Sequence, residues 1–97
     1  MTPDAGDEEL GPWVAVALPT SEVVTVRLRG WQQAGDGSWW AACRLALWSQ
    51  VSTPDGERAE PADVDFLAPA ARVEPVDGQD YHAVPRVRHR DAVRRRR

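Results

Sequence analysis

The stretch WWAACRLALWSQV, residues 39–51, alternates between two rows of side chains. The odd-numbered row is almost wholly apolar and includes Trp39, Ala41, Cys43, Leu45, Leu47 and Val51. The even-numbered row is mixed and consists of Trp40, Ala42, Arg44, Ala46, Trp48 and Gln50. Because successive side chains of a strand point to opposite faces, the pattern predicts a β-strand with one buried face. A helix is the alternative, but the paired tryptophans, Val51 and the turn signals on both sides favour the strand.

Turn-forming clusters divide the chain into further short strands. The segments QAGDGS (33–38) and STPDGE (52–57) both contain Asp-Gly, which suits tight reverse turns. The runs between such clusters are rich in β-branched and apolar residues, so they predict strands. The predicted strands cover residues 12–19, 20–32, 39–51, 58–69 and 72–76. The fourth is expected to be centred on residues 62–67, and one helical turn is expected at residues 69–72.

Together these elements predict an all-β fold, a small five-stranded SH3-like barrel over residues 12–81. In this architecture a strongly bent sheet closes over one core, and one helical turn precedes the last strand. A small OB-type barrel is the alternative, but OB folds usually place a helix between the third and fourth strands, where STPDGE leaves no room. The acidic residues 1–11 and the Arg-rich residues 82–97 are expected to be disordered tails.

Matching the apolar rows of the two central strands predicts their register. The inward pairs in a simple antiparallel arrangement are Leu28 with Cys43, Val26 with Leu45, and Val24 with Leu47. The outward pairs in the same register are Trp31 with Trp40, Arg27 with Arg44, and Val23 with Trp48. A β-bulge would shift the pairing by one residue, and Gly30 is a suitable place for one.

The outward row gathers tryptophan and arginine side chains. Its members are Trp31, Trp40, Trp48, Arg27, Arg29 and Arg44. Because these residue types dominate binding hot spots, the row predicts a non-enzymatic adaptor that binds a protein partner or a second copy of itself. A structural role is the alternative, in which Trp31 and Trp40 stack across the strands and Asp63, Asp65 or the N-terminal DEE (residues 7–9) neutralises the arginines. Trp39 falls on the other row and is expected in the core.

Charge is distributed unevenly along the chain. Residues 1–85 contain fourteen acidic residues and five arginines, whereas residues 86–97 contain seven arginines and one aspartate. Such a basic tail suits binding to phosphates by counterion release, and exposed tryptophans suit stacking on bases. The sequence therefore predicts nucleic-acid binding as an alternative function. The arginines concerned are Arg86, Arg88, Arg90, Arg94, Arg95, Arg96 and Arg97.

Little in the sequence favours catalysis. Cys43 is the only cysteine, lies on the inward row and is expected to be a small core residue. Both histidines, His82 and His89, lie in the predicted tail, so we expect neither a nucleophile–base pair nor a zinc site. Asp63 and Asp65 share one face of their strand and are expected to be solvent-facing acids. No cofactor, metal or small-molecule substrate is expected.

The start of the chain, MTPDAGDEEL, has neither basic residues nor an apolar run, so no signal peptide is expected. No stretch of the sequence reaches the roughly 18 apolar residues that a membrane helix requires. We therefore expect a cytoplasmic protein that makes no membrane contact.

The sequence resembles known proteins in its short motifs and in its predicted strand order. GDGSWWAACRLALW, followed by VDFLAPAARVEPVDGQDY, resembles short uncharacterised actinobacterial proteins in which a DGxWW hairpin precedes a VDF-AP strand and a DGxDY end. The strand order is also similar to SH3-like and Tudor-like domains, where an aromatic-rich hairpin forms part of a binding surface. The resemblance covers residues 13–81 and implies no catalytic residues. In Tudor-like domains an aromatic cage binds methylated side chains, but Arg27, Arg29 and Arg44 would repel such a cation.

Overall fold

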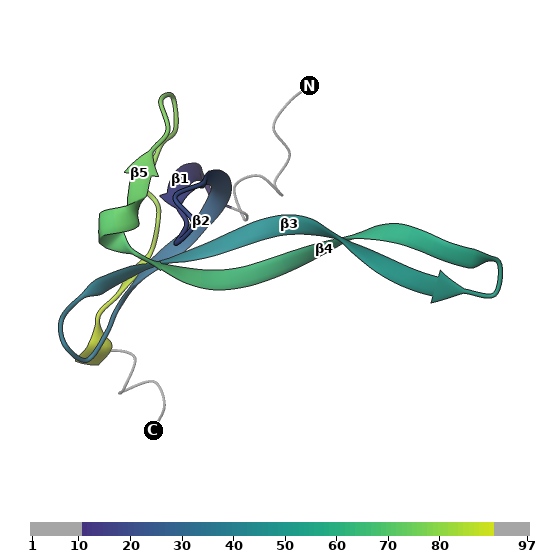
Figure 1. Ribbon diagram of the computed structural model, residues 1–97. Coiled ribbons are helices and arrows are strands. Elements are labelled where there is room, and N and C mark those ends of the chain that lie inside the picture. The colour runs from purple at the N-terminus through teal and green to yellow at the C-terminus, as the bar shows by residue number, and fades with distance from the viewer. Residues whose placement is uncertain (1–10, 91–97) are drawn as a thin grey trace.

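The computed structural model describes residues 11–90. The elements in chain order (Figure 1) are β1 (Trp13–Ala17), β2 (Val23–Gln33), β3 (Trp39–Thr53), β4 (Gly56–Pro69), the 3-10 turn η1 (Ala70–Arg72), β5 (Val73–Pro75) and β6 (Arg86–Val87). The all-β class is therefore confirmed, and β1 to β5 coincide with the five predicted strands. The predictions for residues 1–10 and 91–97 lie outside the described residues.

All the strands belong to one sheet, which is antiparallel except at β6. Its order is β4-β3-β2-β1-β5, and β6 pairs with β2 in parallel. β2 serves both halves of the sheet, because its residues 23–27 pair with β1 and its residues 27–33 pair with β3. The end strands β4 and β5 do not pair with each other, so within residues 11–90 the sheet does not close into a barrel.

A β-bulge in β2 decides which side chains face the core. The predicted pairs of Leu28 with Cys43 and Arg27 with Arg44 are confirmed, and the register shifts between Leu28 and Gly30, where a bulge was expected. The extra residue exchanges the inward and outward rows beyond it. Trp31 therefore lies opposite the buried Ala41 and packs against the core, so the predicted pairing of Trp31 with Trp40 is wrong.

The other predicted β2–β3 pairs do not form either. Val26 with Leu45, Val24 with Leu47 and Val23 with Trp48 are absent from the observed register. The first half of β2, residues 23–27, is bent away from β3 and pairs with β1 instead. Residues 23–26 and 45–48 accordingly belong to different parts of the sheet.

The core lies where β1, β2 and the base of β3 and β4 meet. Its fully buried side chains are those of Val14, Val16, Val26, Leu28, Ala41, Cys43 and Ala68. Phe66, Trp31, Tyr81 and Val84 pack around it. The hydroxyl of Tyr81 donates to the carbonyl oxygen of Trp13 at 2.6 Å, which ties the segment after β5 to β1. The core is small because only the base of the longest hairpin contributes to it.

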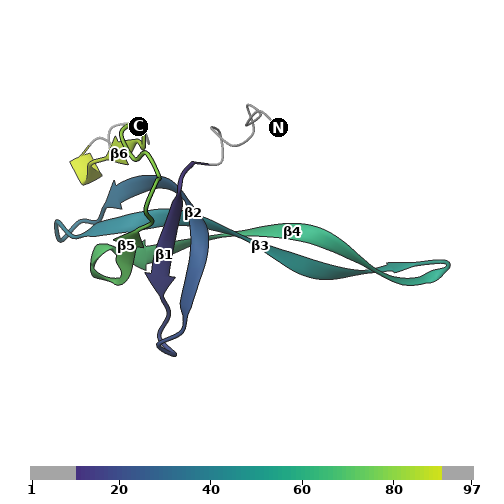
Figure 2. The same ribbon diagram turned by 90° about the horizontal axis from the view of Figure 1, so that it is seen from above.

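Beyond Arg44, β3 and β4 continue as a two-stranded ribbon, here called the arm (residues 45–64). The register between the two strands is unbroken from Trp40–Pro69 to Thr53–Gly56. The arm projects from the rest of the sheet and twists along its length (Figures 1 and 2), which makes the molecule elongated, 50 × 35 × 32 Å. The apolar row that fills the core continues along the arm, where Leu47 and Val64 are exposed.

The ordered body extends past the boundary predicted at residue 81. β6 (Arg86–Val87) lies within the segment for which the sequence predicted a disordered tail. The backbone N–H of Trp31 donates to the carbonyl oxygen of Pro85 at 2.9 Å, and Val84 packs against the core. The side chain of Val84 and the carbonyl group of Pro85, directly before the first tail arginine, therefore hold this segment against the core and β2.

Candidate functional site

The register of β3 and β4 defines two faces of this hairpin. Residues directly opposite in an antiparallel pair point to the same side. The face turned away from the core, here called the outer face, carries the pairs Trp40–Pro69, Ala42–Leu67, Arg44–Asp65, Ala46–Asp63 and Trp48–Pro61. It holds three of the six residues that the sequence predicted as a binding surface.

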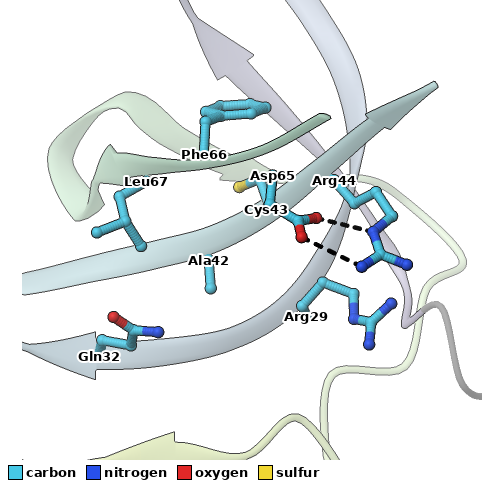
Figure 3. A pocket seen from close by; sticks show the side chains of 8 residues that line it. All are labelled: Arg29, Gln32, Ala42, Cys43, Arg44, Asp65, Phe66 and Leu67. Carbon is cyan, nitrogen blue, oxygen red and sulfur yellow. Dashed lines mark hydrogen bonds and ion pairs between the residues drawn. The ribbon is translucent and has the colours of Figure 1, made fainter. Parts of the chain in front are cut away.

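A shallow pocket of about 360 Å³ lies where β2 meets this outer face (Figure 3). Its wall includes side chains from three strands: Arg29 and Gln32 of β2, Ala42 and Arg44 of β3, and Asp65 and Leu67 of β4. Arg29 is the extra residue of the bulge and Gln32 follows it, and both side chains line this pocket. The pocket is apolar around Leu67 and charged around Arg44 and Asp65.

Arg44 and Asp65 form a bidentate ion pair at the charged end of the pocket (Figure 3). Arg44 Nε lies 2.8 Å from Asp65 Oδ1, and Nη2 lies 3.2 Å from Oδ2. The hydrogen bond from Arg44 holds the pKa of Asp65 below its ordinary value, and Arg29 lowers it further by its charge. Asp65 therefore neutralises Arg44, as the structural alternative for the arginine row expected of Asp63 or Asp65.

Arg27 is turned toward the N-terminal strand and is not part of this pocket. Its guanidinium carbon lies 3.8 Å from the ring centroid of Trp13, a cation–π contact. Its Nη1 donates to the carbonyl oxygen of Gly11 at 3.0 Å. The arginine row predicted from the sequence is thus divided, with Arg29 and Arg44 at the pocket and Arg27 fastening β1 to β2.

Trp40 lines a second, more apolar pocket of about 340 Å³ next to the first. The two pockets share Gln32 and Leu67. The indole N–H of Trp40 donates to Ser38 Oγ at 3.0 Å, and that hydroxyl donates to Asp36 Oδ1 at 2.6 Å. These hydrogen bonds join the ring edge to the β2–β3 turn. The hydrogen bonds that the hydroxyl and the backbone N–H of Ser38 donate to Asp36 hold the pKa of Asp36 below its ordinary value.

The remaining predicted tryptophans lie elsewhere. Trp31 is half-buried on the core side, so its assignment to the outward surface is wrong. Trp48 lies on the outer face but on the arm, with 77 % of its surface exposed. Eight residues separate Trp48 from Trp40, which corresponds to roughly 26 Å along a strand. Because the ribbon also twists over that length, the two side chains do not form one flat patch.

Two residues of the pocket were not predicted as binding residues. Leu67 follows Asp65 on the same row of β4 and is 52 % exposed. Gln32 reaches the outer face only because the bulge exchanges the rows. The alternation in VDFLAP (64–69) places Leu67 on the same row as Asp65, so its outward position could have been predicted. The outward position of Gln32 could not, because it depends on the bulge.

A third opening, of about 490 Å³, lies at the β2–β3 turn and shares Gln33 and Ala34 with the second pocket. Trp39 lines it together with Arg88, His89 and Arg90. Trp39 is on the core row, but it lies beyond the buried cluster and is only half-buried, so the expectation that it lies in the core is wrong. Arg86 is exposed on β6, and Arg94, Arg95, Arg96 and Arg97 lie outside the described residues.

Cys43 is a buried packing residue, as predicted. Burial raises the pKa of its thiol to about 11. Within residues 11–90 no group of three or more His, Cys, Asp and Glu side chains is placed to hold a metal ion. No helix in the same part of the chain is long and apolar enough to cross a membrane.

Comparisons with protein-family models, with curated proteins and with solved structures found no match to the chain.

Proposed function

We propose that this protein is a non-enzymatic interaction module that binds another protein through the arm and the adjoining outer face. The observation that carries the proposal is the exposure of Leu47, Trp48 and Val64 on the arm, at 47, 77 and 43 %. Trp48 lies on the outer face, whereas Leu47 and Val64 lie on the opposite face, so the arm exposes large apolar side chains on both faces. Such side chains on a projecting element favour protein association because their burial releases water. Tryptophan is also among the residue types that contribute most to binding energy.

The two pockets at the base of the arm support the same proposal. Leu67 and Trp40 offer apolar surface, and Arg29 and Arg44 offer charged hydrogen-bond donors beside it. A partner that contacts the arm can therefore also make polar contacts at its base. The candidate catalytic groups support a non-enzymatic role, because Asp65 is engaged by Arg44 and the Cys43 thiol is buried.

We also propose that the fold is SH3-like, in the sense of a bent five-stranded sheet with an unusually long hairpin. The strand order β4-β3-β2-β1-β5 supports this, and so does the 3-10 turn η1 directly before β5. The arm corresponds to an extension of the hairpin between the third and fourth strands.

The test is capture of partner proteins from an extract of the cells that produce this protein. We expect the double variant Leu47→Ser/Trp48→Ser to lose captured protein at least about tenfold, as for loss of a hot-spot side chain. The matched control is Val23→Ser, which removes an apolar side chain that is 65 % exposed but lies on β2, away from the arm. Equal capture by both variants would contradict the proposal.

A second candidate function, nucleic-acid binding, is favoured by the opening that Trp39 shares with Arg88, His89 and Arg90. An aromatic ring beside several cations suits a base stacked on the ring with its phosphates on the arginines. We expect binding to a single-stranded oligonucleotide, measured by quenching of tryptophan fluorescence, to weaken steeply with salt. Binding that is unchanged in Arg88→Gln/Arg90→Gln would exclude this site.

A further inference from the structure

The arm has two free edges within the part of the chain that the structure describes. β2 leaves β3 after the pair Arg27–Arg44, since its residues 23–27 pair with β1. The stretch of β3 from Leu45 to Thr53 is therefore paired only with β4. β4 is an end strand of the sheet, so its outer edge is also unpaired among these residues. Unpaired edges present backbone donors and acceptors to any further strand.

The turn at the tip of the arm determines which backbone groups face each edge. Thr53 and Gly56 flank a two-residue turn, and the pair that closes such a turn is hydrogen-bonded. Bonded and non-bonded pairs then alternate, so even-numbered residues of β3 and odd-numbered residues of β4 direct their N–H and C=O groups to the free edges. The pairing of Trp48 with Pro61 fits, because proline has no N–H for the ladder.

The two edges differ in what they offer to another strand. β4 carries Pro61 midway along its outer edge and the acidic Glu57 and Asp63 on either side. Proline and charge are the usual means by which a natural edge strand avoids pairing. The stretch Leu45–Thr53 of β3, LALWSQVST, contains neither a proline nor a charged residue. The β3 edge is therefore the edge that can accept a strand.

We propose that the β3 edge binds the same edge of a second copy of this chain, antiparallel about a two-fold axis. This rests on the proposed function, since it names one partner for the arm. A strand that pairs with its own copy meets its own sequence in reverse. At β4 this would bring together a charged stretch in which three of the four charged residues are acidic (Glu57, Arg58, Glu60 and Asp63). The uncharged stretch of β3 avoids this repulsion.

The resulting sheet joins two arms into four strands. It satisfies the outward N–H and C=O groups of Ala46, Trp48 and Gln50 in both copies. It also brings the exposed Trp48 side chains of the two copies together on the outer face and the exposed Leu47 side chains together on the opposite face. A two-stranded ribbon is marginally stable in water, whereas further strands sharing an apolar face make it stable. The length of the arm would then serve to provide a strand edge long enough for dimerisation.

The experiment compares two proline variants on the same rung of the arm. Gln50 and Ala59 lie opposite each other, and their N–H groups point to the β3 edge and the β4 edge respectively. Gln50→Pro therefore blocks the edge that dimerises, whereas Ala59→Pro blocks the other and serves as the matched control. In sedimentation equilibrium of the full chain we expect the wild type and Ala59→Pro to dimerise. Gln50→Pro should weaken the dimer at least about tenfold.

A wild type that stays monomeric at high micromolar concentration overturns the proposal, as does a dimer that both variants weaken equally or that Gln50→Pro leaves intact. If Gln50→Pro does not fold, exchange of the Trp48 amide hydrogen in the wild type decides, because it must slow as protein concentration rises. A concentration-independent rate overturns the proposal. If the protein is monomeric but its capture of other proteins still depends on Leu47 and Trp48, the proposed function stands and only the dimer is refuted. If the protein neither dimerises nor captures other proteins through Leu47 and Trp48, both proposals are refuted.

Discussion

The fold requires glycine at position 11, because it leaves no room there for a side chain. Its φ of 85° lies in the left-handed region, and a Cβ at this position would overlap the carbonyl oxygen of Leu28. We expect Gly11→Ala to lower the free energy of unfolding by about 1–2 kcal/mol for the backbone conformation. The overlap should add at least about 1 kcal/mol. Urea denaturation measures the sum.

Gly78→Ala is the matched control for this substitution. Gly78 has nearly the same φ, 84°, but a Cβ there meets nothing within 4 Å. It should therefore show the conformational cost without the overlap. Equal losses in the two variants would mean that the approach of Gly11 to β2 does not constrain the fold.

Burial of Cys43 predicts a dependence of stability on alkaline pH. The pKa of the thiol rises from its ordinary value of 9.0 to about 11 in the fold, because burial disfavours the thiolate. The unfolded chain thus loses its proton first, and the stabilisation present below about pH 9 is lost as the pH rises towards 11. Between pH 8 and about pH 10.5 the wild type should lose about 2 kcal/mol more than Cys43→Ala. Urea denaturation of both at each pH measures this, and parallel losses would contradict it.

The pKa of Asp65 reports the ion pair on the outer face. Arg44 holds that pKa below 3.8 mainly through its hydrogen bonds, so Arg44→Gln should raise it toward the ordinary value. Asp36 is the internal control, because its pKa is lowered by Ser38 and not by Arg44. NMR titration of both carboxyl groups provides the measurement. An unchanged pKa of Asp65 in the variant would show that the pair does not persist in solution.

At the scale of elements, β6 shows that the start of the predicted tail contributes to stability. Val84 packs against the core directly before this strand. We expect Val84→Ala to lower the free energy of unfolding by about 1 kcal/mol, since it removes two partly buried methyl groups. Val23→Ala makes the same chemical change at an exposed position of β2 and should cost less. If the two valines prove equivalent in thermal unfolding, the contact of this segment with the core is not formed.

The elements that the sequence predicted well are those with a local cause. Alternation placed β3, and the Asp-Gly turns placed its ends within about two residues. The bulge near Gly30 was also predictable, because glycine marks such sites. Its effect on Trp31 was not, since a shift of one residue exchanges the faces of everything beyond it. The candidate site was consequently half-predicted, with Trp40, Arg29 and Arg44 present and Trp31 and Arg27 elsewhere.

At the scale of the whole molecule, the arm was the feature that the sequence did not reveal. Leu45, Leu47 and Val64 continue the apolar alternation of the core strands, so the sequence pattern predicts that they are buried. Leu47 and Val64 are exposed because β3 has β4 on one edge but loses β2 from its other edge where β2 turns toward β1. That turn is a tertiary effect, and no local pattern in either strand encodes it. The same pattern therefore describes a core in one half of β3 and an exposed ribbon in the other.

The connectivity of the arm also sets the order of folding. β3 and β4 are joined by a two-residue turn, so they can pair within microseconds, as hairpins do. The body must instead bring β1 against β5, which lie far apart in the sequence, and such non-local closure is slow. We therefore expect the hairpin to exist before the core does. During that interval, the β3 edge along the whole hairpin is open, and association of two nascent chains competes with completion of the fold.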